Sequence, residues 1–166
     1  MHIDEPAWPL IDNFFYELAQ GRSDVTVRRY ARVRHRLVSF LDTADMTLGL
    51  GDNRSLLLEA ERQFHDSGAF WTLYGPDELI ECLPSFMHET WLPRGVGEAR
   101  LQISVVRRLL LMLLRQDLRC GPGTSRAVAQ AHDAIDQARL AIDNRSAHPA
   151  GTQMPARFWQ QPGQKW

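Results

Sequence analysis

The chain has 166 residues, of which 44 % are hydrophobic and 23 % are charged, and its formal net charge is −1. This composition is typical of one soluble globular domain with its own core, and the near-neutral charge argues against a uniformly basic nucleic-acid binder. The longest apolar run, Leu109–Leu114, is far shorter than the roughly 20 residues that a membrane-spanning helix needs. Cys82 and Cys120 lie far apart, so they predict neither a disulfide framework nor a zinc site.

The N-terminus and the basic residues give a first expectation about location. Residues 1–6 include two acids and lack the basic and apolar regions of a signal peptide. Together with the separated cysteines, this favours a reducing, cytoplasmic location. Lys165 is the single lysine among nineteen basic residues, a bias that indicates a bacterial genome of high GC content.

The first helix is predicted over residues 9–20, with Pro9 at its start and Gly21 as its stop. Ser23 is a suitable N-cap for a second helix that extends to about residue 41 or 42. The apolar residues of this second helix fall on one face and predict a core contact: Val27, Tyr30, Val33, Leu37, Phe40 and Leu41.

The middle of the chain predicts a loop over residues 47–53 and a third helix from about 52 to 66. An aromatic connector over residues 70–74 should then fill a gap in the core. A fourth helix begins at Gly75 or Pro76 and extends toward Trp91, with a kink or break at Pro84. The apolar residues of the third helix are expected to face the core: Leu56, Leu57, Ala60 and Phe64.

The fifth helix, over about 97–118, is the most apolar segment and is expected to be the central element. A sixth helix over about 124–144 carries a stripe of alanines for close packing on a neighbour. Residues 149–166 are rich in glutamine and proline and predict a flexible tail. The sequence therefore predicts an all-α, single-domain bundle of five or six helices over residues 1–148, followed by that tail.

Charge is unevenly distributed along this predicted bundle. Residues 22–36 contain six arginines and one acid, residues 42–89 contain ten acids and two arginines, and residues 94–119 contain six arginines and two acids. Such segregation creates a local positive field even on a neutral protein.

The order of helices and several residues resemble the N-terminal, SAM-like core-binding domain of tyrosine recombinases and phage integrases. The second helix opens with the pattern Ser23, Thr26 and Tyr30, and an arginine-containing apolar helix closes the unit at residues 99–114. The resemblance covers about residues 8–118, and the long acidic stretch from residue 43 to residue 91 departs from it. Because the family's catalytic domain has no counterpart here, the resemblance implies a DNA-clamping module without strand-cleavage activity.

Arginines on the second and fifth helices are the candidate nucleic-acid contacts. On helical wheels they gather opposite the apolar faces, where guanidinium groups can bind phosphates in pairs of hydrogen bonds. Two such faces could line one groove around double-stranded DNA. The alternative is that they are solvated or paired with the acids of residues 42–89. The candidate set is Arg22, Arg28, Arg29, Arg32, Arg36, Arg100, Arg107 and Arg108.

Other residues give weaker signals of chemistry. Cys82 and His88 are six apart and poorly placed to share a metal, and Ser85 lacks the glycine-flanked turn of a hydrolase nucleophile. We therefore predict no catalytic residue, no metal and no cofactor. The alternative function is a protein-interaction adaptor that uses the acidic segment 42–89, the alanine-rich sixth helix, or the tail aromatics Phe158, Trp159 and Trp166.

Overall fold

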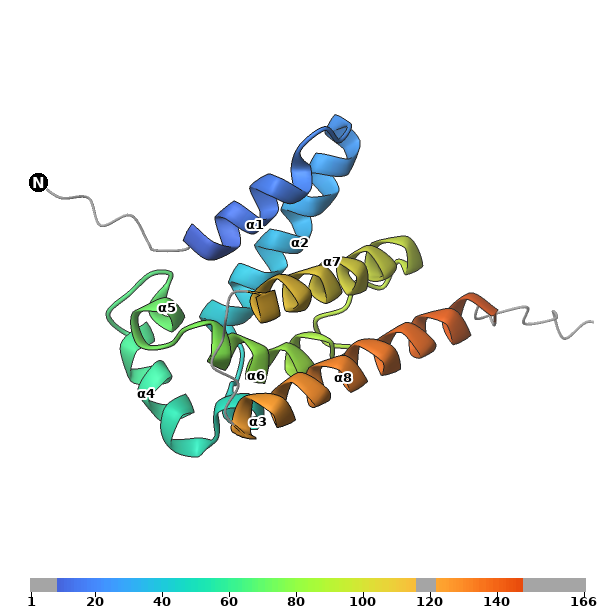
Figure 1. Cartoon of the computed structure of the whole chain (residues 1–166). Coiled ribbons are helices and arrows are strands. Elements are labelled where there is room, and N and C mark those ends of the chain that lie inside the picture. Colours follow the sequence, from blue (N-terminus) through green and yellow to red (C-terminus); the bar gives the residue numbers. More distant parts are fainter. Residues whose placement is uncertain (1–8, 116–121, 148–166) are drawn as a thin grey trace, which may run out of the picture.

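The computed structural model describes residues 9–115 and 122–147, and within these ranges it contains eight helices and no strand (Figure 1). The all-α prediction is confirmed. The helices are α1 (Pro9–Ala19), α2 (Asp24–Thr43), α3 (Thr47–Leu50), α4 (Asp52–Arg62), α5 (Ala69–Leu73), α6 (Pro76–Phe86), α7 (Val96–Arg115) and α8 (Pro122–Ala147).

Helices α1 and α2 form an antiparallel hairpin that stands out from the rest of the molecule (Figure 1). Gly21 turns the chain with a φ of +67°, a left-handed conformation that favours glycine. The Ser23 hydroxyl accepts a hydrogen bond from the amide of Thr26, as the N-cap prediction requires. The apolar face of α2 is buried as predicted, except that Val27 remains 36 % exposed near the tip of the hairpin.

Helix α6 lies at the centre of the packed core, in contact with α3, α7 and α8. Its acidic first turn begins as predicted, because Glu78 accepts a hydrogen bond from the amide of Gly75. Phe86 at its end packs against Phe40, with ring centroids 5.1 Å apart. The buried side chains of α6 are Leu79, Ile80, Cys82, Leu83 and Phe86.

The long helices α7 and α8 complete the core. Helix α7 buries Val105, Val106 and Leu109 together with other apolar residues, as predicted. Helix α8 lies along α6 and α7 (Figure 1). The small side chains of Ala127, Ala131 and Ala138 are buried. The expected packing of the alanine stripe on a neighbour holds for these residues, whereas Ala134 is half-buried and Ala141 is exposed.

Several predicted details of the middle segment are wrong. The expected loop at 47–53 contains α3, and the aromatic connector folds into α5, which raises the helix count above six in the described ranges. Helix α4 ends at Arg62 rather than Asp66, and α6 ends at Phe86 rather than Trp91. Pro84 lies inside α6, two residues before its end, and its missing amide hydrogen removes only the helical bond to the Ile80 carbonyl.

Candidate interaction surfaces

Helix α4 presents its apolar side chains to solvent, contrary to the prediction that they face the core. The exposed fractions are 68 % for Leu56, 52 % for Leu57 and 81 % for Phe64, which lies two residues beyond the helix. Ala60 is also exposed. We call Leu56, Leu57, Ala60 and Phe64 the α4 stripe. Isolated exposed apolar residues are common, but a contiguous group at helical spacing is typical of an interaction site.

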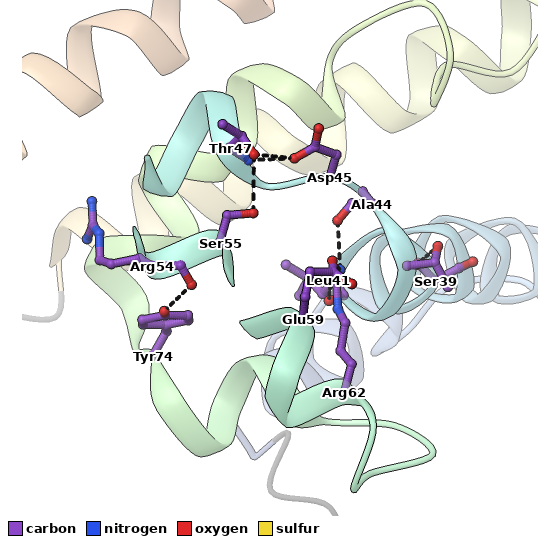
Figure 2. Close-up of polar contacts among 11 residues, drawn as sticks. Ser39, Leu41, Ala44, Asp45, Thr47, Arg54, Ser55, Glu59, Arg62 and Tyr74 are labelled. Atoms are coloured by element: carbon purple, nitrogen blue, oxygen red, sulfur yellow. Dashed lines mark hydrogen bonds and ion pairs between the residues drawn. The ribbon is translucent and has the colours of Figure 1, made fainter. Parts of the chain in front are cut away.

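The opposite face of α4 explains why the stripe points outward. Leu58 is fully buried and Ser55 is 5 % exposed, so this face is the one that meets the core. One turn further on, the Arg62 guanidinium donates hydrogen bonds to the carbonyl oxygens of Leu41, at 2.7 Å, and Ala44, at 2.9 Å (Figure 2). These carbonyls lie at the end of α2, where no further turn of the helix supplies amide groups to donate hydrogen bonds to them. Arg62 thus fixes the rotation of α4 about its own axis.

A second set of polar contacts holds the beginning of α4. Arg54 donates to the Leu50 carbonyl and forms an ion pair with Glu81 at 2.7 Å. The Tyr74 hydroxyl donates to the Arg54 carbonyl at 2.6 Å, and desolvation raises the pKa of this phenol (Figure 2). With both ends anchored, the α4 stripe is a fixed surface feature.

Carboxylates border the α4 stripe on one side. Asp45, Asp52 and Glu59 line a cavity of about 620 Å³ together with Leu56. Asp45 accepts hydrogen bonds from the Thr47 hydroxyl and amide, and these bonds lower the pKa of its carboxyl group (Figure 2). The surface around the stripe is therefore apolar at its centre and negative at its edge.

The arginines of α2 are divided between internal contacts and solvent. Arg29 donates to Glu98 at 3.0 Å, and Arg32 lies 3.6 Å from the same carboxylate. Arg36 donates to Gln102 at 2.7 Å, and burial lowers the pKa of its guanidinium. Within the described ranges, Arg28 and also Arg22, which lies in the turn before α2, are exposed and have no ion pair.

The arginines of α7 point in two directions. Arg100 and Arg107 line a cavity beside α8, whereas Arg108 lines another beside α1. The arginines of α2 that reach α7 contact its first turns, through Glu98 and Gln102. The described residues thus hold the candidate arginines in several separate places: in solvent near the hairpin tip, against the first turns of α7, beside α8 and beside α1.

The acidic segment does not supply the partners of these arginines. Glu59 forms its ion pair with Arg62, and Glu78 and Glu81 form theirs with Arg54. The arginines of α2 and α7 instead pair with acids outside that segment, such as Glu98 and Asp143. The positive and negative regions of the sequence therefore remain separate surfaces in the folded protein.

A further cavity, of about 700 Å³, lies between α6, α8 and the end of α2. Phe40 and Trp91 contribute its aromatic wall, and Asp45, Glu81 and Asp133 are its carboxylates. No sequence motif predicts this cavity, because its lining residues come from separate segments of the chain. Cys82, which follows Glu81 on α6, is fully buried, and burial raises the pKa of this thiol to about 12.

The remaining candidates yield no further site. In the part of the chain that the structure describes, no three histidine, cysteine or acidic side chains gather as metal ligands. None of the described helices combines the length and apolar character needed to cross a membrane. The predicted partner-binding residues Phe158, Trp159 and Trp166 lie outside the described ranges. No family model, curated protein or solved structure matches this chain.

Proposed function

We propose that this protein is a protein-interaction module whose contact surface is the α4 stripe. The observation that carries the proposal is the outward orientation of an apolar helix face that is anchored from behind by Arg54 and Arg62. Burying such side chains against a partner is favourable by roughly 25 cal/mol for each Å² of apolar area removed from water.

The charges around the stripe specify the chemistry of the partner. Asp45, Asp52 and Glu59 form a negative edge, so a partner that covers the stripe gains from basic groups at the matching border. A partner helix with leucine-like side chains at one face and lysine or arginine at its borders satisfies both features. We therefore assign a cationic amphipathic helix as the bound element.

A designed peptide tests this assignment directly. The probe is a helical peptide with leucines at core-facing heptad positions and lysines elsewhere, and its counterpart replaces lysine by glutamate. We expect the full-length protein to bind the lysine peptide, and the Leu56→Ser/Phe64→Ser variant to bind it about tenfold more weakly, as for a hot spot. The measurement is fluorescence anisotropy of the labelled peptide.

The matched control is Leu140→Ser, because Leu140 is 64 % exposed on α8 and lies outside the stripe. This variant should bind the lysine peptide like the wild type. The proposal would be contradicted if Leu140→Ser and Leu56→Ser/Phe64→Ser lost the same affinity for the lysine peptide. It would also be contradicted if the wild type did not bind this peptide.

A second candidate function is DNA binding, in line with the resemblance to recombinase core-binding domains. It is supported by the exposure of Arg22 and Arg28 on the projecting hairpin, with Arg32 beside them on α2. In the described ranges neither Arg22 nor Arg28 has an ion pair, so no bound carboxylate cancels the field of these two guanidinium groups, whereas Arg32 lies 3.6 Å from Glu98.

The test of this candidate is the salt dependence of binding to a labelled duplex of about 30 base pairs. Affinity should fall by roughly 0.9 log unit per log unit of salt for each phosphate contact. Arg28→Gln should reduce both the affinity and this slope. Arg34→Gln is the control, because Arg34 on the same helix is paired with Asp12 at 2.7 Å. If the duplex does not bind at low salt, the DNA-binding function is ruled out. The proposal for the α4 stripe is not affected by that result.

A further inference from the structure

Several arginines lie together in the groove between α7 and α8. Neither of the two proposed functions assigns a role to this group. Its lining comprises Arg100, Ser104 and Arg107 from α7, with Arg139 and Asp143 from α8, in a volume of about 420 Å³. One face of α7 carries residues 100, 104 and 107, which are three or four positions apart. One face of α8 likewise carries residues 135, 139 and 143. Two packed helices thus direct these rows toward the same space.

The charges in this groove do not balance. Asp143 is the one carboxylate in the lining, and it is shared: Arg100 lies 2.9 Å from it and Arg139 lies 4.0 Å from it. Arg100 also donates to the Ser146 hydroxyl at 3.2 Å. In the described part of the chain Arg107 has no ion pair, so the three arginines exceed the carboxylate by two positive charges.

The floor of the groove strengthens the attraction for an anion. Ile103 is 6 % exposed and Ile135 is 2 % exposed, and both line the cavity. An apolar floor keeps water away from one side of a bound anion, where the lower effective dielectric makes charge interactions stronger. Guanidinium groups bind phosphate oxygens in pairs of hydrogen bonds, and the Ser104 hydroxyl at the edge can add another.

From this geometry we propose that the α7–α8 groove is a phosphate-binding site. Arg107 is the principal ligand, Arg100 and Arg139 are held beside it by Asp143, and the apolar floor accommodates the carbon body of a phosphate ester. The same chemistry suits a small phosphate ester or the backbone of a nucleic acid. The inference does not depend on the α4 stripe.

The experiment titrates the full-length protein with pyrophosphate and with phenyl phosphate by isothermal calorimetry at low salt. Arg107→Gln removes the charge and keeps much of the bulk of an exposed side chain, and we expect it to weaken binding of both ligands about tenfold or more. Arg139→Gln should weaken binding to a smaller extent. Arg108→Gln is the matched control, because the next residue along α7 faces the cavity beside α1.

A labelled DNA duplex then separates the two sources of the phosphate group. If Arg107→Gln weakens both the small ligands and the duplex while Arg108→Gln does not, the site binds nucleic-acid phosphates as well. If it weakens the small ligands alone, the site is specific for small esters. Absence of pyrophosphate binding by the wild type, or equal losses in Arg107→Gln and Arg108→Gln, overturns the proposal, since only general charge would then be at work.

Discussion

Gly49 shows how one missing side chain permits the contact between α3 and α6. A Cβ atom added at this position would lie 2.8 Å from the Glu81 carbonyl oxygen and 3.1 Å from the Cα and Sγ atoms of Cys82. The first of these neighbours is backbone, so relief of the contact requires movement of a whole helix. The position therefore accepts glycine for reasons of space, since its backbone φ is not in the left-handed region.

We accordingly expect Gly49→Ala to lower the free energy of unfolding by about 1–3 kcal/mol, as overpacking of a core does. Alanine is the better helix former, so any loss must come from the steric contact. Gly97→Ala is the control, because Gly97 also lies in a helix and an added Cβ there would meet only the Arg29 guanidinium, at 3.9 Å. Urea unfolding measures both variants, and equal stability of Gly49→Ala and the wild type would contradict the packing described.

Gln102 is the second residue whose chemistry links two elements. It is fully buried, accepts the hydrogen bond of Arg36 and donates one to the Trp91 carbonyl at 3.1 Å. Arg36 is therefore a structural residue, although its sequence pattern suggested a solvent-facing phosphate ligand. A wheel shows that it lies away from the apolar face, but it cannot show that a neighbouring helix supplies a buried amide.

Gln102→Leu should lower the free energy of unfolding by about 1–3 kcal/mol, because it leaves the Arg36 guanidinium and the Trp91 carbonyl without their partner. Adding Arg36→Met to this variant removes the unpaired cation. The double variant should therefore be more stable than the sum of the single losses predicts, by an interaction energy of about 0.5–3 kcal/mol. Strictly additive losses in urea unfolding would show that the two side chains are not coupled.

Among the helices, α2 and α4 show what hydrophobic periodicity can and cannot predict. On α2 the apolar face is also the buried face, and the sequence identified its five fully packed members correctly. On α4 the periodicity is equally clear, but the buried face carries Ser55, Leu58 and Arg62. Periodicity reports that a helix has two unlike faces. The direction of each face depends on tertiary contacts, here those of Arg62 with the end of α2.

The short helices α3 and α5 were not predicted from the sequence, for a related reason. Helix α3 has only four residues, too few to be stable alone, and its place depends on the close contact of Gly49 with α6. Helix α5 depends on Phe70, which is fully buried and packs against Trp71 and Tyr74 with ring centroids 5.3 and 5.5 Å away. Packing against residues distant in the sequence determines both helices, so the local sequence pattern does not predict them.

The orientation of α4 leads to a prediction about stability that is separate from binding. Leu56→Ser/Phe64→Ser should change the free energy of unfolding by less than about 1 kcal/mol, because both side chains are already in water. Leu58→Ala should lower it by about 2–5 kcal/mol, since it opens a cavity at a fully buried position. Urea unfolding of both variants measures the contrast. A reversed order would mean that the stripe faces the core after all.

At the scale of the whole molecule, opposite charges occupy distant regions. The turn between α1 and α2, which carries Arg22, lies at one extreme of the molecule, and α4 with its acidic border lies at the other (Figure 1). A partner at one surface leaves the other accessible. The net charge of −1 is therefore the sum over two separate surfaces of opposite charge.

The same architecture predicts a gradient of local stability from the hairpin tip to the core. Near the tip, Tyr16 is 69 % exposed and Val25 is 66 % exposed, so little apolar area holds residues 16–27 to the rest of the protein. At the centre, Leu79, Ile80 and Leu83 of α6 are fully buried between several helices. Local opening requires less free energy where fewer buried contacts are broken.

Hydrogen exchange followed by mass spectrometry measures this gradient. Helical amides of residues 27–30, at the start of α2, should exchange on the order of a hundredfold faster than those of residues 79–86 in α6. Amides of α2 near residues 37–41 provide an internal control, because they belong to the same helix but pack on the core. We expect them to exchange as slowly as α6. Uniform protection along α2 would show that the hairpin opens only with the whole domain, and would contradict the assignment of the arginine-bearing tip as its least stable part.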